Sequence, residues 1–504
     1  MITPDTTEET AFDLSLIKHI PLTFAKTNMV LPVRRDASVL EGYVSDMQGA
    51  FALSEIAASL ALKPKPILID REKLLALINR IYAMAGSAAE VMDNMSEGDF
   101  DTVATEFESP KDIMELTGDA PIIRLLNALL QQAVKENASD IHIEPYENDL
   151  QVRMRIDGIL RKILTPPKII QDALISRVKI MANMDIAQRR LPQDGRIRLL
   201  ISGKDIDVRV SIIPSVFGER AVLRILDRKQ GLMGLSALGF DDVTKGKLET
   251  LLSRPHGIFL VTGPTGSGKT TTLYAALNHI YSEEKNIITI EDPVEYQIRG
   301  IAQIGVNTRI GLTFASGLRS VLRHDPDVIM VGEIRDFDTA EIAVQASLTG
   351  HLVLSTLHTN DAVSSVTRLI DMGVEPFLIA SSLCGVVAER LIRVVCSECK
   401  EQYEPTELER SYFSFPVETL FRGKGCPRCN NTGYFGRIGI FELFAIEPGV
   451  LPLINSNTDS TAIKNYAIEH GMKTLRQDGL IKAATGQTSL QEVLRVTQKD
   501  DAGI

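Results

Sequence analysis

The chain has 504 residues, which corresponds to roughly three or four domains. Its apolar fraction of 44% and charged fraction of 24% are ordinary for globular proteins, and it contains neither a long apolar run nor a basic leader, so we expect no membrane span, no signal peptide and a cytoplasmic location. The net charge of −11 lacks the basic footprint of a nucleic-acid motor, so no nucleic-acid partner is expected.

The first 120 residues divide into a small domain and an acidic segment. Apolar residues have helical spacing in two stretches, 51–60 and 71–82. They predict a small mixed N-terminal domain over residues 1–84. Residues 90–119 then contain ten acidic residues and one basic residue, Lys111. Such a composition is typical of a solvated linker, which we assign to residues 85–118, although an ordered acidic surface is the alternative.

An α+β domain is predicted over residues 119–232. A strongly amphipathic helix begins at Pro121, and a strand follows at 139–145. Residues 150–156 alternate as a strand, and Asp157-Gly158 supplies a hairpin turn into 159–163. The remaining expected elements are a helix at 170–183 and strands near 196–202, 205–212 and 220–226.

Residues 233–504 alternate short apolar strands with helices, which predicts an α/β domain with a mostly parallel sheet. This domain contains a cysteine-bearing insert at 390–435 and a helical tail at 447–504. A helix is also predicted through 378–387, where Cys384 should be a small buried residue.

A phosphate-binding loop follows the buried strand predicted at 258–262. Its sequence matches G-x-x-x-x-G-K-[ST] in full, and the helix predicted at 269–280 begins within it. Glycines let backbone N–H groups turn toward a triphosphate, Lys269 should reach the β and γ phosphates, and the Thr270 hydroxyl should bind Mg²⁺. The alternative is a chance glycine-rich turn. The residues expected to bind ATP are Gly263, Pro264, Thr265, Gly266, Ser267, Gly268, Lys269, Thr270 and Thr271.

Two carboxylates follow the next predicted strands of this domain. Glu291 follows the strand predicted at 286–290. After the strand predicted at 328–331, Gly332 stands where an ordinary P-loop ATPase carries an Asp, and Glu333 comes next. Because parallel strands end at one edge of a sheet, both lie on the side of the phosphate loop. We assign Glu333 to activate the attacking water and Glu291 to a place near the metal. The alternative is a pair of solvated strand-end acids.

Histidines flank the strand predicted within residues 349–360. His351 precedes it, and His358 ends it. A lone strand histidine is usually structural, but two in one strand of a nucleotide domain favour phosphate sensing.

Four cysteines form two CxxC pairs in the insert. Cys396 and Cys399 make one pair, and Cys426 and Cys429 make the other. Two such turns close a tetrahedron around Zn²⁺, and the surrounding glycines favour a structural zinc site over a redox pair or an iron–sulfur site.

The chain resembles the ATPases of the type II secretion and type IV pilus superfamily from about residue 120 onward. Four segments carry the resemblance: the loop at 263–270, the acidic box at 288–296, the box at 325–336 and the histidine box at 349–361. The resemblance implies a RecA-like P-loop ATPase domain, preceded by a PAS-like α+β domain. Retraction ATPases of type IV pili are shorter and lack a CxxC pair, so both cysteine pairs favour an assembly motor.

Further expectations follow from this resemblance. They are a homohexamer, phosphate contacts from Arg209 and Arg224 across a subunit boundary, and a location at the cytoplasmic face of the inner membrane. Arg319, Arg323 and Arg335 are weaker candidates, and solvated surface is the alternative for the arginines. Residues 1–84 resemble the type II secretion branch, in which this domain docks onto the cytoplasmic domain of a bitopic membrane protein, and a polytopic platform protein is a second partner.

The leading hypothesis is a motor that drives pseudopilus assembly and protein export. A type IV pilus extension ATPase is the first alternative. A nucleic-acid translocase would require a basic pore, and the complete loop with Glu333 argues against a catalytically dead scaffold.

Overall fold

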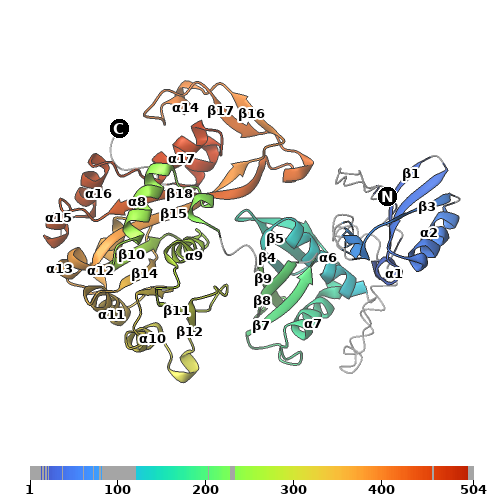
Figure 1. Cartoon of the computed structure of the whole chain (residues 1–504), viewed down its shortest axis with the longest axis horizontal. Coiled ribbons are helices and arrows are strands. Elements are labelled where there is room, and N and C mark those ends of the chain that lie inside the picture. Colours follow the sequence, from blue (N-terminus) through green and yellow to red (C-terminus); the bar gives the residue numbers. More distant parts are fainter. Residues whose placement is uncertain are drawn as a thin grey trace. The chain divides into compact units, whose positions relative to one another are not determined.

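A computed structural model describes the protein over residues 22–36, 38–60, 62–71, 121–201, 204–227, 233–456 and 459–497, with a few more residues between 13 and 20 and between 73 and 81. It forms two compact units, Met1–Lys229 and Gln230–Ile504 (Figure 1). The acidic segment at 85–118 and Tyr82 lie outside the described residues. Within the described ranges, no helix is both long and apolar enough to cross a membrane.

The N-terminal part contains a three-stranded sheet in the order β1-β2-β3. β1 pairs antiparallel with β2, which pairs parallel with β3. Asp46 caps α2 by accepting from the Gly49 amide, and α2 buries Leu53 in the small core. The described residues between 71 and 81 are helical, as predicted. The elements are α1 Leu22–Thr27, β1 Val30–Asp36, β2 Val39–Val44, α2 Met47–Ser59 and β3 Lys63–Leu68.

The part from Pro121 to Asp227 contains an antiparallel sheet in the order β6-β5-β4-β9-β8-β7. Every second residue of β5 is buried, because that face packs in one core with α6 and α7. Asp157 and Gly158 have φ of 49° and 81°, which confirms the predicted hairpin turn. The elements are α6 Pro121–Lys135, β4 Ala138–Pro145, β5 Leu150–Ile156, β6 Ile159–Leu164, α7 Gln171–Met181, β7 Gln193–Ile201, β8 Lys204–Ser215 and β9 Gly218–Asp227.

The unit from Gln230 onward is built on a seven-stranded sheet in the order β12-β11-β13-β14-β10-β15-β18. All neighbours pair in parallel except β15 and β18. The strands are β10 Gly257–Thr262, β11 Ile287–Glu291, β12 Ala302–Gly305, β13 Val328–Val331, β14 Leu352–Leu357, β15 Leu383–Val395 and β18 Tyr434–Ala445.

Helices cover both faces of this sheet, so its central strands are rich in apolar residues and are buried along their whole length. Apolar residues of α8 and α9 form the core on one face, and residues of α10 to α13 form the core on the other. The helices are α8 Asp242–Leu252, α9 Lys269–Ile280, α10 Phe314–Val321, α11 Phe337–Leu348, α12 Ser364–Asp371 and α13 Pro376–Ser382.

The helix predicted through 378–387 is wrong in its second half. α13 ends at Ser382, and β15 begins at Leu383 because this segment pairs with β10 on one side and β18 on the other. Cys384 therefore lies on a strand. It is buried, as predicted, and its thiol donates to the Ile258 carbonyl at 3.0 Å.

β15 and β18 carry the cysteine insert at their far ends, and four helices complete the tail. The insert contains the ribbon of β16 and β17. These elements are β16 Lys400–Tyr403, α14 Glu407–Arg410, β17 Leu420–Gly423, α15 Leu451–Asn455, α16 Ser460–Glu469, α17 Leu475–Ala484 and α18 Leu490–Val496.

Candidate active site

The phosphate loop connects the central strand β10 to α9, and α9 has the predicted bounds. Gly263 and Gly268 have φ of 148° and 111°, a region that favours glycine. A Cβ on Gly263 would lie 2.6 Å from Ser267 Oγ and from the Glu389 carbonyl oxygen. The loop can therefore follow this path only with glycine at its start.

The polar groups of the loop are arranged for an anion. Lys269 Nζ donates to the carbonyls of Gly263 and Pro264 at 2.9 and 3.0 Å, and it stands at the N-terminus of α9. Burial lowers the pKa of Lys269, whereas Glu389 and Glu333 raise it. Thr270 is exposed, so its hydroxyl can reach a cation beside a phosphate. These residues fit both a nucleotide and its Mg²⁺.

Glu333 and His358 meet at the same edge of the sheet. Glu333 follows β13, and its Oε1 lies 2.5 Å from Arg335 Nη2. His358 follows the neighbouring strand β14, and its Nε2 lies 3.5 Å from Glu333 Oε2. Burial and the Lys269 charge lower the pKa of His358, so the neutral imidazole predominates at pH 7. The structure thus brings together Lys269, Glu333 and His358 from the segments that follow three adjacent strands, β10, β13 and β14.

Glu291 is held in a buried hydrogen-bond network at the end of β11. It accepts from the hydroxyl of Tyr274 on α9, from Thr289 Oγ1 at 2.6 Å and from Gln303 Nε2 at 3.0 Å. Its side chain therefore ties the P-loop helix to the sheet. The part that Glu291 plays in catalysis stays a prediction.

His351 does not lie at the phosphate loop, so a sensing role is wrong for this residue. It precedes β14, at the end of the sheet opposite the loop, because β10 and β14 are parallel. Its Nδ1 lies 2.8 Å from the Ala346 carbonyl oxygen, where it holds the end of α11. His351 is thus one of the structural histidines that a strand usually contains.

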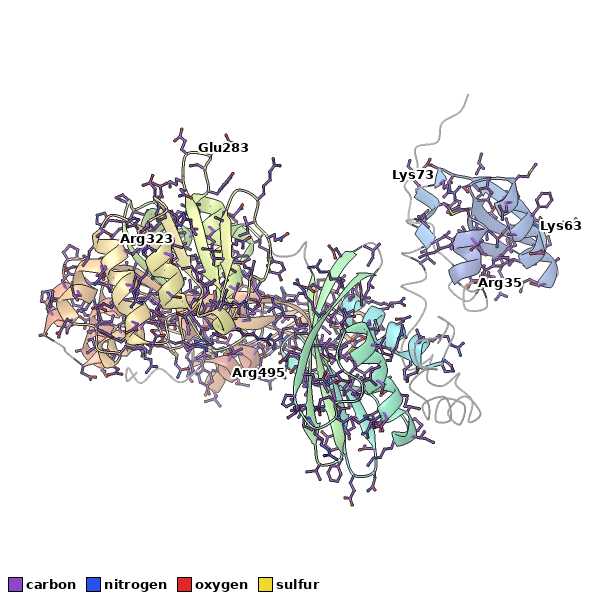
Figure 2. All side chains as sticks on the ribbon, turned by 90° about the horizontal axis from the view of Figure 1, so that it is seen from below. Arg35, Lys63, Lys73, Glu283, Arg323 and Arg495 are labelled. Carbon is purple, nitrogen blue, oxygen red and sulfur yellow. The ribbon has the colours of Figure 1, made fainter. Side chains whose placement is uncertain are left out.

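The candidate arginines lie in different surroundings. Arg224 on β9 lies opposite Arg209 on β8, and its Nε donates to Asp140 at 3.0 Å. Both belong to the Met1–Lys229 unit. In the other unit, Arg335 pairs with Glu333, whereas Arg323, labelled in Figure 2, donates to the Arg319 carbonyl on α10.

Sequence reasoning missed Glu389, a buried acid on β15. Its Oε2 accepts from Thr272 Oγ1 on the first turn of α9 at 2.5 Å. Glu389 lies just past the apolar run 378–387 that the sequence predicts as a helix, and only the pairing of β15 with β10 brings it to the loop.

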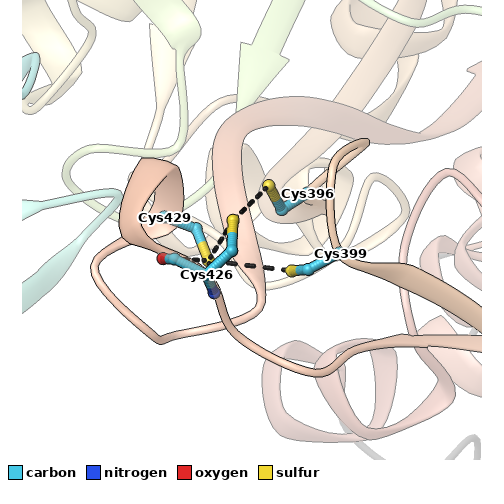
Figure 3. Close-up of side chains that lie close together, drawn as sticks. All are labelled: Cys396, Cys399, Cys426 and Cys429. Carbon is cyan, nitrogen blue, oxygen red and sulfur yellow. Dashed lines mark hydrogen bonds between the residues drawn. The ribbon is translucent and has the colours of Figure 1, made fainter.

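The four cysteines of the insert converge on one point (Figure 3). Their Sγ atoms lie 3.7 to 3.8 Å apart in the pairs Cys396–Cys426, Cys399–Cys429 and Cys426–Cys429, and all lie within 4.8 Å of one another. A tetrahedron with metal–sulfur bonds of about 2.3 Å has edges of about 3.8 Å. Backbone amides of Gly425 and Gly433 point at Sγ atoms from 3.3 Å, as is usual around bound thiolates. The four thiols therefore fit a tetrahedral metal ion.

The strand order of the sheet, the phosphate loop and Glu333 at the same edge of the sheet define the chain as a P-loop ATPase. Residues 115–495 match the family described as "Type II/IV secretion system protein", and residues 7–88 match the MshEN domain. The chain belongs to the type II/IV secretion system protein family.

Two of its relatives match the chain over nearly their whole length. The type II secretion system ATPase E of Vibrio cholerae is 47% identical over 96% of this chain and 97% of its own. The type II secretion system protein HxcR of Pseudomonas aeruginosa is 48% identical over 95% of this chain and 99% of its own. Among solved structures, the pilus retraction motor PilT with bound ADP is 25% identical with a TM-score of 0.51 over 74% of this chain and 97% of its own. The Legionella pneumophila ATPase DotB, 20% identical with a TM-score of 0.56 over 73% and 94%, shares the fold.

The cysteine geometry leads to a prediction about metal content. Protein purified without chelator should contain one divalent metal ion per chain, and Cys396→Ser should lose it, because three thiolates leave the tetrahedron open. Elemental analysis measures this. Cys384→Ala is the matched control and should keep the ion. A metal-free wild-type protein, or a Cys396→Ser variant with full metal content, would contradict the assignment.

Proposed function

We propose that this chain is the ATPase of a type II secretion system, which hydrolyses ATP to drive pseudopilus assembly and protein export. The observation that carries the proposal is the convergence of Lys269, Glu333 and His358 at the edge of the sheet where the P-loop lies. The names of the relatives in Vibrio cholerae and Pseudomonas aeruginosa supply the secretion system.

In this proposal each residue of the site has a separate role toward ATP. The amides of the loop 263–270 and Lys269 hold the phosphates of ATP, and the Thr270 hydroxyl binds Mg²⁺, which neutralises phosphate charge when bound. Glu333 orients the attacking water and takes its proton. His358 contacts the γ-phosphate side of the site and reports its state, and Glu291 positions α9 through Tyr274. The ion of the cysteine cluster is Zn²⁺ in a structural role, because the site offers four thiolates and no open position.

The two main residues have separable roles, and this tests the catalytic assignment. Lys269→Ala should abolish nucleotide binding. Glu333→Gln should keep binding and lower the hydrolysis rate by about 10²- to 10⁴-fold, because the amide cannot take a proton. Titration with Mg·ATP and phosphate-release assays measure the two steps. Glu341→Gln, an exposed acid on α11, is the control. Hydrolysis by Glu333→Gln at a near-native rate would show that another residue activates the water.

The proposed hexamer gives Arg209 and Arg224 a role across a subunit boundary, because mobile arginines stabilise charge on a transferred phosphoryl group. Chains carrying Arg209→Ala and chains carrying Lys269→Ala should each be inactive. Mixed rings contain some interfaces with both residues intact, so mixing should partly restore ATPase activity. If mixed rings form, as shown by differently tagged subunits, and no mixture exceeds either variant alone, Arg209 does not act across the boundary.

We also propose that residues 1–84 recruit the motor to the inner membrane through a bitopic membrane protein, with a polytopic platform protein as a second partner. A lipid anchor would need a basic patch. Arg35, Lys63 and Lys73 instead lie at separate places around the domain (Figure 2). The acidic residues 90–119 would also repel anionic lipid. A protein partner is therefore favoured.

Deleting residues 1–84 should remove membrane association in cells and stop export, while the remaining chain keeps its metal and nucleotide binding. Cell fractionation and a secretion assay measure these outcomes. Full-length Glu333→Gln is the control: it should stay at the membrane and still fail to export. Retained membrane association of the truncated chain, or binding of the isolated domain to protein-free anionic vesicles, would reject recruitment by a protein. The membrane partner captured through residues 1–90 also separates secretion from the alternative, type IV pilus extension.

A further inference from the structure

Glu389 lies beneath the P-loop, on the strand that pairs with β10. In this pairing Ala388 stands opposite Thr262, so Glu389 lies beside the first residue of the loop. A Cβ on Gly263 would lie 2.6 Å from the Glu389 carbonyl oxygen, and a Cβ on Gly268 would lie 2.8 Å from Glu389 Oε1. Glu389 thus faces both ends of the loop at close range.

The Glu389 carboxyl group is buried, with 2% of the residue exposed, and one of its oxygens lacks a fixed partner. Thr272 Oγ1 donates to Oε2 at 2.5 Å. Oε1 and the buried Ser267 hydroxyl each lack a hydrogen bond of good geometry within the described residues, although Ser267 lies close enough to lower the pKa of the Glu389 carboxyl group. A buried oxygen without a partner is costly, and this one points toward the loop that we assign to phosphate.

The charges around Glu389 explain why its protonation state matters. Burial raises the pKa of Glu389 to about 8, although Thr272, the Lys269 charge and Ser267 lower it. The charges of Glu389 and Glu333 raise the pKa of Lys269, and Glu389 has the larger effect. Burial and the Arg390 charge lower it. The carboxyl group therefore changes charge near neutral pH, beside the lysine of the loop.

We propose that Glu389 is a positioning residue that links a proton to nucleotide binding, with the neutral carboxyl group favouring bound phosphate and the carboxylate opposing it. The proposal rests on the assignment of Gly263–Thr270 as the nucleotide site. Ionised Glu389 neutralises part of the Lys269 charge and repels phosphate in a buried environment, where charges interact strongly. Neutral Glu389 leaves that charge to the phosphates, and its O–H can donate to Ser267.

Linkage sets the size and direction of the effect. Below pH 8 the free protein carries neutral Glu389, so affinity is greatest there; it falls as pH rises through the pKa of about 8. If bound phosphate keeps the group protonated, affinity should fall by about tenfold between pH 7 and pH 9.

The test measures the affinity of the full chain for Mg·ADP by calorimetry at pH 7 and pH 9. The affinity of the wild-type protein for Mg·ADP should fall by about tenfold from pH 7 to pH 9. The affinity of Glu389→Gln should fall far less, because the amide keeps the shape and carries no charge. Glu442→Gln is the matched control. Glu442 is a buried acid on β18 with its pKa raised by burial to about 7, but it accepts from the amides of Ala362 and Leu475. This control should follow wild type.

A Glu389→Gln variant whose affinity for Mg·ADP falls with pH as steeply as that of the wild-type protein would overturn the proposal.

A second measurement needs no variant. The wild-type protein should take up about half a proton on binding Mg·ADP at pH 8, which calorimetry in buffers of different ionisation enthalpy measures. Zero uptake would also overturn it. Failure of the nucleotide site itself gives a different result, because Lys269→Ala would then bind Mg·ADP as wild type does.

Discussion

The parallel pairing of β10 with β14 on one side and β15 on the other determines which groups surround the P-loop. Parallel strands end at one edge of a sheet, so the loop after β10 meets His358 after β14 and Glu333 after β13. The same pairing places Glu389 under the loop. All six residues of β10 are buried, which fixes the base from which the loop departs.

Two buried acids of this unit show how the surroundings set opposite charge states. Burial alone raises a carboxyl pKa, and nearby cations and hydrogen bonds lower it. Glu492 on α18 is buried, but the guanidinium groups of Arg495 and Arg393 outweigh this and lower its pKa to about 2. Among the described residues, the groups that lower the pKa of Glu389 are the hydroxyls of Thr272 and Ser267 and the charge of the partly buried Lys269, and burial prevails over them. Glu492 thus fastens the tail to β15 with a permanent ion pair, whereas Glu389 keeps a titratable charge at the loop.

The sequence predicted most of the elements, and it pointed to the loop, Glu333 and His358, which the structure brings together, because these depend on local patterns. The alternation in 150–156, the Asp157-Gly158 turn and the glycines of the loop each need only neighbouring residues to be recognised. The failures needed tertiary information. The apolar run 378–387 fits a helix or a buried strand equally well, and pairing with β10 decides it. His351 and His358 look equivalent in sequence, and only the direction of β14 shows which one meets Glu333.

The cysteine insert illustrates what a small segment needs where two strands leave a sheet. β15 and β18 stay paired as far as Val395 and Tyr434, and the insert adds the ribbon of β16 and β17 with the short helix α14 between them. A two-stranded ribbon is marginal in water by itself. In its local core the insert contributes one fully buried apolar residue, Leu420, with Tyr403, Phe413 and Val417 only partly buried, and the helices α17 and α18 supply the other buried residues. With so little apolar burial, the cluster of four thiols and the tail must hold the insert. The insert therefore depends on the thiol cluster and the tail, whereas β10 and the loop are supported by the central sheet.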